Sequence, residues 1–135
     1  MSKEKLYIFD TTLRDGAQTQ GVDFSIDDKE KISVSLDALG VDYIEGGWPG
    51  ANPTDTEFFN KDHGFKNAKL TAFGMTKKLE HSAENDPMLA SLINSKSSSV
   101  CLFGKSWDFQ VDVALGITNE QNLENISESA KHIIS

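Results

Sequence analysis

The sequence predicts a parallel α/β fold made of four strand-then-helix units in a single domain, residues 1–135. Short apolar segments alternate with helix patterns at intervals of roughly 30 residues, the spacing of parallel strands joined by helical crossovers. Polar residues follow each apolar segment, and the first return from helix to strand is a very short turn at Gly40. Long connections after the strands and tight turns before them are typical of α/β barrels.

The first unit begins with residues 6–9, which we expect to form a strand buried on both faces. Ser25 then predicts a helix N-cap, with Asp28 at the capping-box position and Gly40 as the stop. The apolar positions of this helix have the spacing of one buried face: Ile32, Leu36 and Leu39.

The other three units repeat the pattern. Strands are predicted at residues 41–44, 70–73 and 99–103. The second and third helices each open with an N-cap residue followed by proline, at Asn52 and Asp86. Thr118 begins the last helix, for which we expect one apolar stripe. The expected apolar contacts of these helices are Phe58, Phe59, Met88, Leu89, Leu92, Ile93, Leu123, Ile126, Ala130 and Ile133.

Four units amount to half of an eight-unit barrel, which typically has about 250 residues. A flavodoxin-like sheet would need about five strands and a phosphate-binding first loop, whereas this loop contains an arginine and an aspartate. Residues 130–135 end within a helical pattern that has no glycine or proline terminator. We therefore expect the N-terminal half of a (β/α)8 barrel that continues beyond residue 135.

Composition narrows the functional classes. The formal net charge of −8 opposes binding to nucleic acid and to anionic membrane surfaces. Local cations could still hold an anionic small molecule, namely Arg14, Lys77, Lys78 and Lys105. The single cysteine, Cys101, lies in an apolar segment and is expected in the core. No signal peptide or membrane span is recognisable, so we expect a cytoplasmic protein.

The most informative motif follows the first expected strand: DTTLRDGAQ, residues 10–18. The carboxyl ends of barrel strands form the catalytic face. Arg14 offers a permanent planar cation for an oxyanion, and Asp15 offers a hard oxygen ligand for a divalent metal. Two more polar strand ends lie on the same side, EGGWPG at 45–50 and GKSWD at 104–108.

These three segments resemble the 2-isopropylmalate, homocitrate and citramalate synthase family, metal-dependent TIM-barrel enzymes related to 3-hydroxy-3-methylglutaryl-CoA lyase. The sequences GVDYIEGGWPG and FGKSWD are most similar to the citramalate synthase branch. The resemblance extends from residue 6 to the end of the chain and covers the front half of the family's barrel. It implies a Claisen condensation of acetyl-CoA with a 2-keto acid, pyruvate in that branch, followed by thioester hydrolysis, in branched-chain amino-acid biosynthesis.

The resemblance also implies roles for individual residues. Asp15 would bind the divalent metal (magnesium, manganese or zinc), Arg14 would lie beside the ketone oxygen, and Glu45 would be the acidic partner that orients Arg14. A Lewis-acid metal and a fixed guanidinium both lower the cost of the alkoxide that forms. Gln18 matches a family position near the substrate, and the loop residues Lys105 and Ser106 are further candidates for substrate contact.

The sequence departs from the family at the metal site, which a His-x-His pair on a late strand completes. The three histidines of this chain, His63, His81 and His132, do not have that spacing, and we expect each to be structural or solvated. One carboxylate is too few ligands for a catalytic divalent ion. We therefore expect these 135 residues alone to be inactive. Their open half-sheet should associate with another copy, giving a homo-oligomer, or with the missing C-terminal half.

Three alternatives remain open. The keto acid could be 2-ketoisovalerate or 2-oxoglutarate, as in 2-isopropylmalate and homocitrate synthases. Lys105 could instead be the Schiff-base nucleophile of an aldolase. Lastly, the chain could be a non-catalytic half-barrel that acts only by pairing with a complementary chain.

Overall fold

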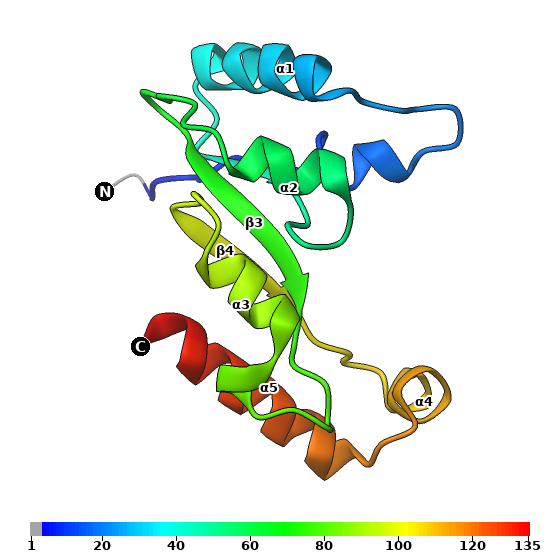
Figure 1. The fold of residues 1–135 in the computed structure, drawn as a ribbon. Coiled ribbons are helices and arrows are strands. Elements are labelled where there is room, and N and C mark those ends of the chain that lie inside the picture. The colour runs from blue at the N-terminus through cyan, green and yellow to red at the C-terminus, as the bar shows by residue number, and fades with distance from the viewer. Residues whose placement is uncertain (1–3) are drawn as a thin grey trace.

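The computed structural model describes residues 4–135 (Figure 1). These residues form a four-stranded sheet in the order β1-β2-β3-β4. All three neighbouring pairs are parallel. The strands are β1 (Phe9–Asp10), β2 (Tyr43–Gly47), β3 (Lys69–Met75) and β4 (Ser99–Phe103). A helix follows each strand: α1 (Ile26–Leu39), α2 (Pro53–Phe59), α3 (Pro87–Ile93) and α5 (Asn119–Ile134). The predicted strand-then-helix order is therefore confirmed.

The predicted helix starts are also confirmed. Ser25 and Thr118 each make a complete capping box, with Asp28 and Gln121 respectively. Asp86 accepts hydrogen bonds from two backbone N–H groups of α3. Gly40 ends α1 at a φ of 88°, a conformation that residues with a side chain rarely adopt. These local signals depend on a few adjacent residues, which is why they could be recognised in the sequence.

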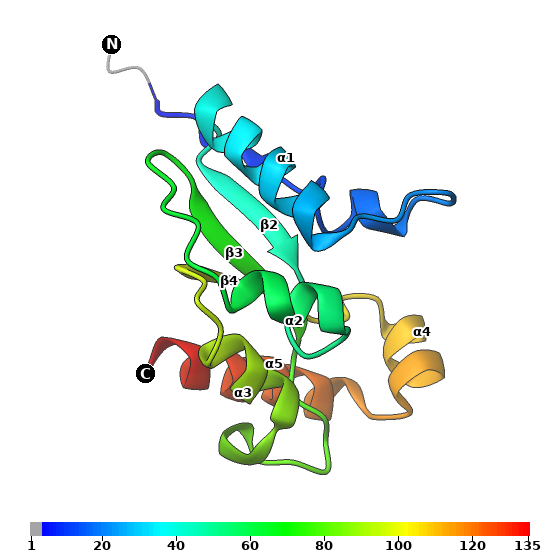
Figure 2. The same cartoon turned by 45° about the horizontal axis from the view of Figure 1, so that its top comes forward.

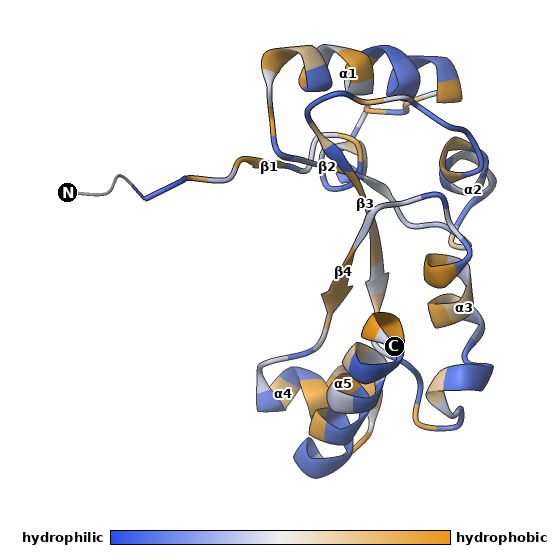
Figure 3. Ribbon diagram, turned by 90° about the vertical axis from the view of Figure 1, so that its left-hand side faces the viewer, coloured by the Kyte–Doolittle hydropathy of each residue, from blue (hydrophilic) through white to orange (hydrophobic). Residues whose placement is uncertain are grey.

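The helices lie along one side of a curved sheet (Figures 2 and 3). The core fills the space between them and the sheet. It includes Ile44, Leu70 and Ala72 from the strands, and its largest helical members are Phe58, Phe59, Leu89 and Leu92. Gly46 of β2 allows this packing, because a Cβ there would lie 2.8 Å from the Phe58 ring. The opposite face of the sheet has no helix over it within residues 4–135 (Figure 3).

The expectation of a fully buried first strand was wrong. β1 has only two residues, and the side chains of residues 6–9 are 45–87% exposed. Within the described chain, β1 is an edge strand that pairs with β2 alone. The aromatic rings of Phe9 and Tyr43 stack with their centroids 5.8 Å apart, on a surface that remains open to solvent.

The predicted apolar faces of α1 and α5 were also incorrect in part. Leu39 and Leu123 are exposed, while Ile32, Leu36, Ile126 and Ile133 are only partly buried and Ala130 is exposed. The fully buried positions are polar: Lys29, Ser33 and Asp37 in α1, and Asn122, Asn125 and Ser129 in α5. Several of these side chains meet loop backbones, which require hydrogen-bond partners that an apolar side chain cannot provide.

Some boundaries differ from the predictions. β2 and β3 continue to Gly47 and Met75, beyond the predicted strand limits at residues 44 and 73. The connection after β4 contains a helical turn, α4 (Asp108–Gln110), followed by a π-helical segment at Val111–Leu115. Neither was predicted. No helix among residues 4–135 has both the length and the apolar composition needed to span a bilayer.

Candidate active site

The DTTLRDGAQ motif folds into a tight turn directly after β1. The Thr11 carbonyl accepts hydrogen bonds from the backbone N–H groups of Arg14, Asp15 and Gly16, at 3.2, 2.8 and 3.1 Å. The Asp10 carboxylate accepts from the backbone N–H of Thr12 at 2.9 Å, which fixes the start of the turn. The turn therefore presents Arg14 at the carboxyl edge of the sheet, as the sequence predicted.

Arg14 and Glu45 form the central ion pair of this edge. Arg14 Nε donates to Glu45 Oε2 at 2.7 Å, and the Glu45 side chain is only 1% exposed. The β2–β3 register is irregular between Glu45 and Gly47, a local feature that changes the direction of side chains near the strand end. The structure thus brings together the two residues for which the sequence implied a shared role. Arg14 is also the only arginine in the 135 residues.

Two aromatic residues that we did not predict complete the environment of Arg14. Its guanidinium carbon lies 4.1 Å from the centroid of the Phe73 ring. Trp48 contacts the same ring edge-on, with the centroids 5.5 Å apart. Stacking on an aromatic face suits a planar guanidinium, and the rings exclude water from one side of it. Phe73 was missed because a buried strand gives no sign of which residues face the site.

Cys101 on β4 was expected in the core but is only partly buried, beside Glu45. Burial, and then the neighbouring Glu45 carboxylate, raise the pKa of the Cys101 thiol. Three strands therefore contribute to one cluster, defined as Arg14 with Glu45, Phe73 and Cys101. Its chemistry is that of a fixed cation with a buried carboxylate and a protonated thiol.

Asp15 and Gln18 lie on the same turn as Arg14. Asp15 Oδ1 accepts from Arg14 Nη1 at 3.2 Å, and the Asp15 side chain is 62% exposed. Gln18 is exposed and lines a pocket of about 460 Å³ together with Arg14 and Trp48. Both positions allow contact with a bound molecule.

The described residues do not make a complete metal site. Among residues 4–135, no three histidine, cysteine, aspartate or glutamate side chains are grouped so that they could hold a metal ion. His63 is instead stacked between Phe58 and Phe65, with its Nε2 2.9 Å from the Phe58 carbonyl oxygen. Asp15 can supply one ligand, and a divalent ion would need its others from outside this part of the chain.

Lys105 and Ser106 lie farther along the same sheet edge. An aromatic row connects this position to Arg14: Phe73 lies 6.2 Å from Phe103, and Lys105 Nζ lies 5.1 Å from the Phe103 centroid. Ser106 is exposed. The structure therefore does not place these two residues against Arg14. Lys77, another candidate cation, is buried and pairs with Glu128 at 3.1 Å, so its expected role in holding an anion was wrong.

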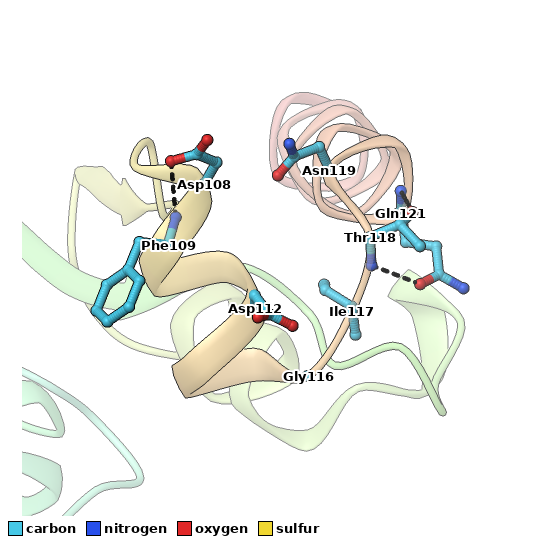
Figure 4. A pocket seen from close by; sticks show the side chains of 8 residues that line it. All are labelled: Asp108, Phe109, Asp112, Gly116, Ile117, Thr118, Asn119 and Gln121. Atoms are coloured by element: carbon cyan, nitrogen blue, oxygen red, sulfur yellow. Dashed lines mark hydrogen bonds between the residues drawn. The ribbon is translucent and has the colours of Figure 1, made fainter.

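A pocket of about 640 Å³ lies between α4 and the start of α5 (Figure 4). Of the polar strand-end segments singled out in the sequence, it contains only the end of GKSWD, Asp108. Asp108 and Asp112 line one side, and Thr118, Asn119 and Gln121 line the other. Gln121 and Thr118 are already occupied by the capping box of α5 (Figure 4). Arg14, Glu45 and Gln18 do not line this pocket.

The fold and this cluster define a class of protein: a parallel α/β protein with polar side chains gathered at the carboxyl ends of its strands. Residues 5–135 match the HMGL-like family model, and the chain belongs to that family. Its domain is a TIM barrel, of which the chain contains the N-terminal part. The four units found here are therefore units of that barrel.

Individual relatives agree with this assignment. The chain is 52% identical over 132 residues to the (R)-citramalate synthase of Aquifex aeolicus, covering 96% of this chain and 25% of that protein. It is 45% identical over 137 residues to the (R)-citramalate synthase of Sulfolobus acidocaldarius, covering 100% and 26%. The 2-isopropylmalate synthase 1 of Caldanaerobacter subterraneus is 33% identical over 133 residues, covering 98% and 32%. The chain thus spans about a quarter of the length of the citramalate synthases it matches.

Proposed function

We propose that this chain is part of a citramalate synthase, which condenses acetyl-CoA with pyruvate and then hydrolyses the thioester. The observation that carries the proposal is the Arg14–Glu45 pair at the carboxyl edge of the sheet, with Arg14 Nε 2.7 Å from Glu45 Oε2. Matches of 41–52% identity to proteins named (R)-citramalate synthase support the choice of pyruvate, since the 2-isopropylmalate synthases are 30–33% identical.

In the proposed reaction a general base takes a proton from the methyl carbon of acetyl-CoA, and the resulting enolate attacks the ketone carbon of pyruvate. The ketone oxygen becomes an alkoxide, which Arg14 stabilises and which then takes up a proton to give the hydroxyl of the product. A guanidinium has five N–H donors. Glu45 and Asp15 each accept one, and the others can reach a substrate oxygen. Water finally cleaves the thioester and releases CoA and citramalate. Glu45 holds the guanidinium in one orientation, so that little rearrangement is needed as the charge develops.

The finer assignments are part of the same proposal. Asp15 would donate one carboxylate oxygen to a divalent metal, whose chemistry would be to polarise the keto acid. Gln18, in the pocket beside Arg14, would contact the substrate, and Lys105 and Ser106 would approach it from the fourth strand end. The substrates are small molecules, and the net charge of −8 supports this over a nucleic-acid or membrane partner. We further propose a cytoplasmic enzyme of isoleucine biosynthesis.

The test is an assay of CoA release by the full-length gene product, with magnesium, manganese or zinc and with each of three keto acids. We expect the highest kcat/KM with pyruvate and little turnover with 2-ketoisovalerate or 2-oxoglutarate. A preference for either larger keto acid would contradict the choice of substrate. Absence of CoA release with all three would contradict the proposed reaction.

The same assay on residues 1–135 alone should give no turnover, since the described residues contain no group of three side chains that could hold a metal ion. Light scattering of that polypeptide should show association, because one face and both edges of its sheet lack a covering element within residues 4–135. A monomer that turns over pyruvate would contradict both expectations.

A further inference from the structure

Lys29 is a buried cation that the proposed reaction does not use. It lies on α1, is 3% exposed, and directs its ammonium group toward the carboxyl edge of the sheet. Its Nζ donates to the Leu13 carbonyl at 3.0 Å, to the Gly46 carbonyl at 2.8 Å and to Asp55 Oδ1. An ammonium group has three donors, so these contacts satisfy all of them.

The two carbonyl groups are adjacent in sequence to the central ion pair. Leu13 directly precedes Arg14, and Gly46 directly follows Glu45. One ammonium group therefore joins the backbone that carries the guanidinium to the backbone that carries the carboxylate. The 2.7 Å contact between Arg14 and Glu45 depends on the relative position of these two segments.

Asp55 pairs with Lys29 through one carboxylate oxygen and holds the end of β2 through the other. Its Oδ2 accepts from the backbone N–H of Trp48 at 2.9 Å and from Asn52 Nδ2 at 3.0 Å. A Cβ at Gly47 would lie 2.5 Å from the Asp55 carboxyl carbon, and Gly47 has a φ of 145°. The Asp55 carboxylate thus fits against backbone that only glycine permits, and it links α2 to the end of β2.

Burying this ion pair is costly, and apolar residues of similar size would often be equally or more stabilising. Apolar residues could not, however, hold two carbonyl oxygens at fixed positions. We propose that Lys29, held by Asp55, is a positioning residue: it fixes the backbones of Arg14 and Glu45 relative to each other and so sets the orientation of the guanidinium. This inference rests on the proposed function only for its kinetic consequence.

The first test is a double-mutant cycle in the full-length gene product. Lys29→Met combined with Asp55→Asn removes both buried charges and keeps an acceptor for the Trp48 N–H. We expect kcat to fall on the order of 100-fold, as for loss of one oriented transition-state donor, with a KM for pyruvate changed by less than about 3-fold. In an Arg14→Met background the same pair of substitutions should cause no further loss, because the group they position is absent.

A second measurement does not require activity. In protein labelled with ¹⁵N-arginine, the Arg14 Nε–H signal is identified by its disappearance in Arg14→Lys. We expect this N–H to exchange slowly in the parent and at least ten times faster in the Lys29→Met/Asp55→Asn variant, because its bond to Glu45 is misaligned. Lys61→Met is the matched control: Lys61 also pairs with a residue of α1, Glu30 at 2.5 Å, but contacts neither strand end. It should leave kcat and the Nε–H signal unchanged.

The possible outcomes distinguish failure of the proposed reaction from failure of the positioning role of Lys29. If the parent releases no CoA with any keto acid, the proposed reaction is wrong, and the Arg14 Nε–H exchange rate still decides the positioning role. If the parent is active but the losses from Lys29 and Arg14 multiply, and the Nε–H signal is unchanged, Lys29 is only structural and the inference is overturned.

Discussion

The strand ends of β1 and β2 differ sharply from the strand end of β4. At β1 and β2, Arg14, Glu45, Lys29 and Asp55 form a connected set of buried or partly buried contacts that joins two strands to two helices. At β4, Trp107 and Phe109 are 57% and 56% exposed, and Ser106 is exposed as well. The comparison indicates that the first two strand ends are preorganised, whereas the fourth is not fixed by the described residues.

The helices α1 and α5 show a second contrast, in the hydrogen bonds of their buried polar side chains. In α1 the Asp37 carboxylate accepts from the backbone N–H groups of Lys66, Asn67 and Ala68 at 2.8–3.0 Å. In α5, Asn122 Nδ2 donates to the Lys105 carbonyl at 2.8 Å, but Asn122 Oδ1 is buried without a hydrogen-bond partner among residues 4–135. The Asp37 carboxylate is thus fully paired, whereas the buried Asn122 amide is only partly satisfied. At the end of β2, Trp48 Nε1 is also buried without a hydrogen-bond partner among residues 4–135.

The largest effect should come from Arg14→Lys, which tests whether the preorganised end carries the chemistry. Lysine keeps the charge but loses the planar contact with Phe73 and the oriented Nε–H bond to Glu45. We expect kcat/KM of the full-length enzyme for pyruvate to fall by roughly 100-fold to 1000-fold. Steady-state CoA release measures it. A loss below 10-fold would mean that charge alone suffices and that the geometry of this edge is not important.

Much of this edge could be predicted from the sequence because its signals are local. The turn, the helix caps and the Arg14–Asp15 motif depend on residues within a few positions of each other. The partners could not be predicted in the same way. Phe73 reaches Arg14 only through the β2–β3 pairing, and Lys29 was hidden because a lysine in a helix is usually solvated. The exposure of β1 was missed because burial depends on which strands lie on either side of it.

A second prediction concerns the α1 side of the comparison. Asp37→Asn replaces one acceptor oxygen with an amide that cannot accept the Lys66 N–H bond. The cost should be about 2 kcal/mol, which corresponds to roughly 30-fold faster amide exchange. Hydrogen–deuterium exchange of the 66–68 peptide in the full-length protein measures it. Asn122→Ala, on the α5 side, is the comparison variant and should change exchange of the 104–106 peptide less than 10-fold. Equal changes in amide exchange for Asp37→Asn and Asn122→Ala would show that the α1 and α5 contacts are equally important.

Lowering the pH also tests the hydrogen bonds from residues 66–68 to Asp37, because protonation weakens this carboxylate as an acceptor. The backbone N–H groups of Ala68 and Lys66 lower the pKa of Asp37 by favouring its charged form. Because the folded-state pKa is below the unfolded one, this stabilisation is fully present above the usual aspartate pKa of about 4 and is lost as the pH falls toward the lowered value. Protection of the 66–68 amides should therefore be constant from pH 8 to 5 and decrease only below about pH 4.

Cys101 gives a third prediction, because it lies on β4 but contacts the preorganised end. Burial and the Glu45 carboxylate raise its pKa, so less thiolate is present at a given pH. We expect iodoacetamide to alkylate Cys101 at pH 8 about 10-fold more slowly than a free cysteine peptide. Mass spectrometry of the Cys101 peptide measures the rate. Glu45→Gln should accelerate it, and a rate equal to that of the peptide would show that Cys101 is not held beside Glu45.

The smallest effect is expected at the loosely held end. Lys105 Nζ lies over the Phe103 ring at 5.1 Å and is separated from Arg14 by the row formed by Phe103 and Phe73. Lys105→Met should therefore lower kcat by less than about 3-fold, since solvent and salt screen a charge that two aromatic rings separate from Arg14. The KM of the Lys105→Met variant for pyruvate should rise no more than 10-fold.

The Schiff-base alternative requires the opposite result from Lys105→Met, because removing a covalent nucleophile abolishes turnover. Borohydride with pyruvate should leave no adduct on Lys105, and chelator should abolish activity. A trapped adduct that forms despite chelator would show that the reaction depends on Lys105 at the end of β4, and not on Arg14 at the end of β1.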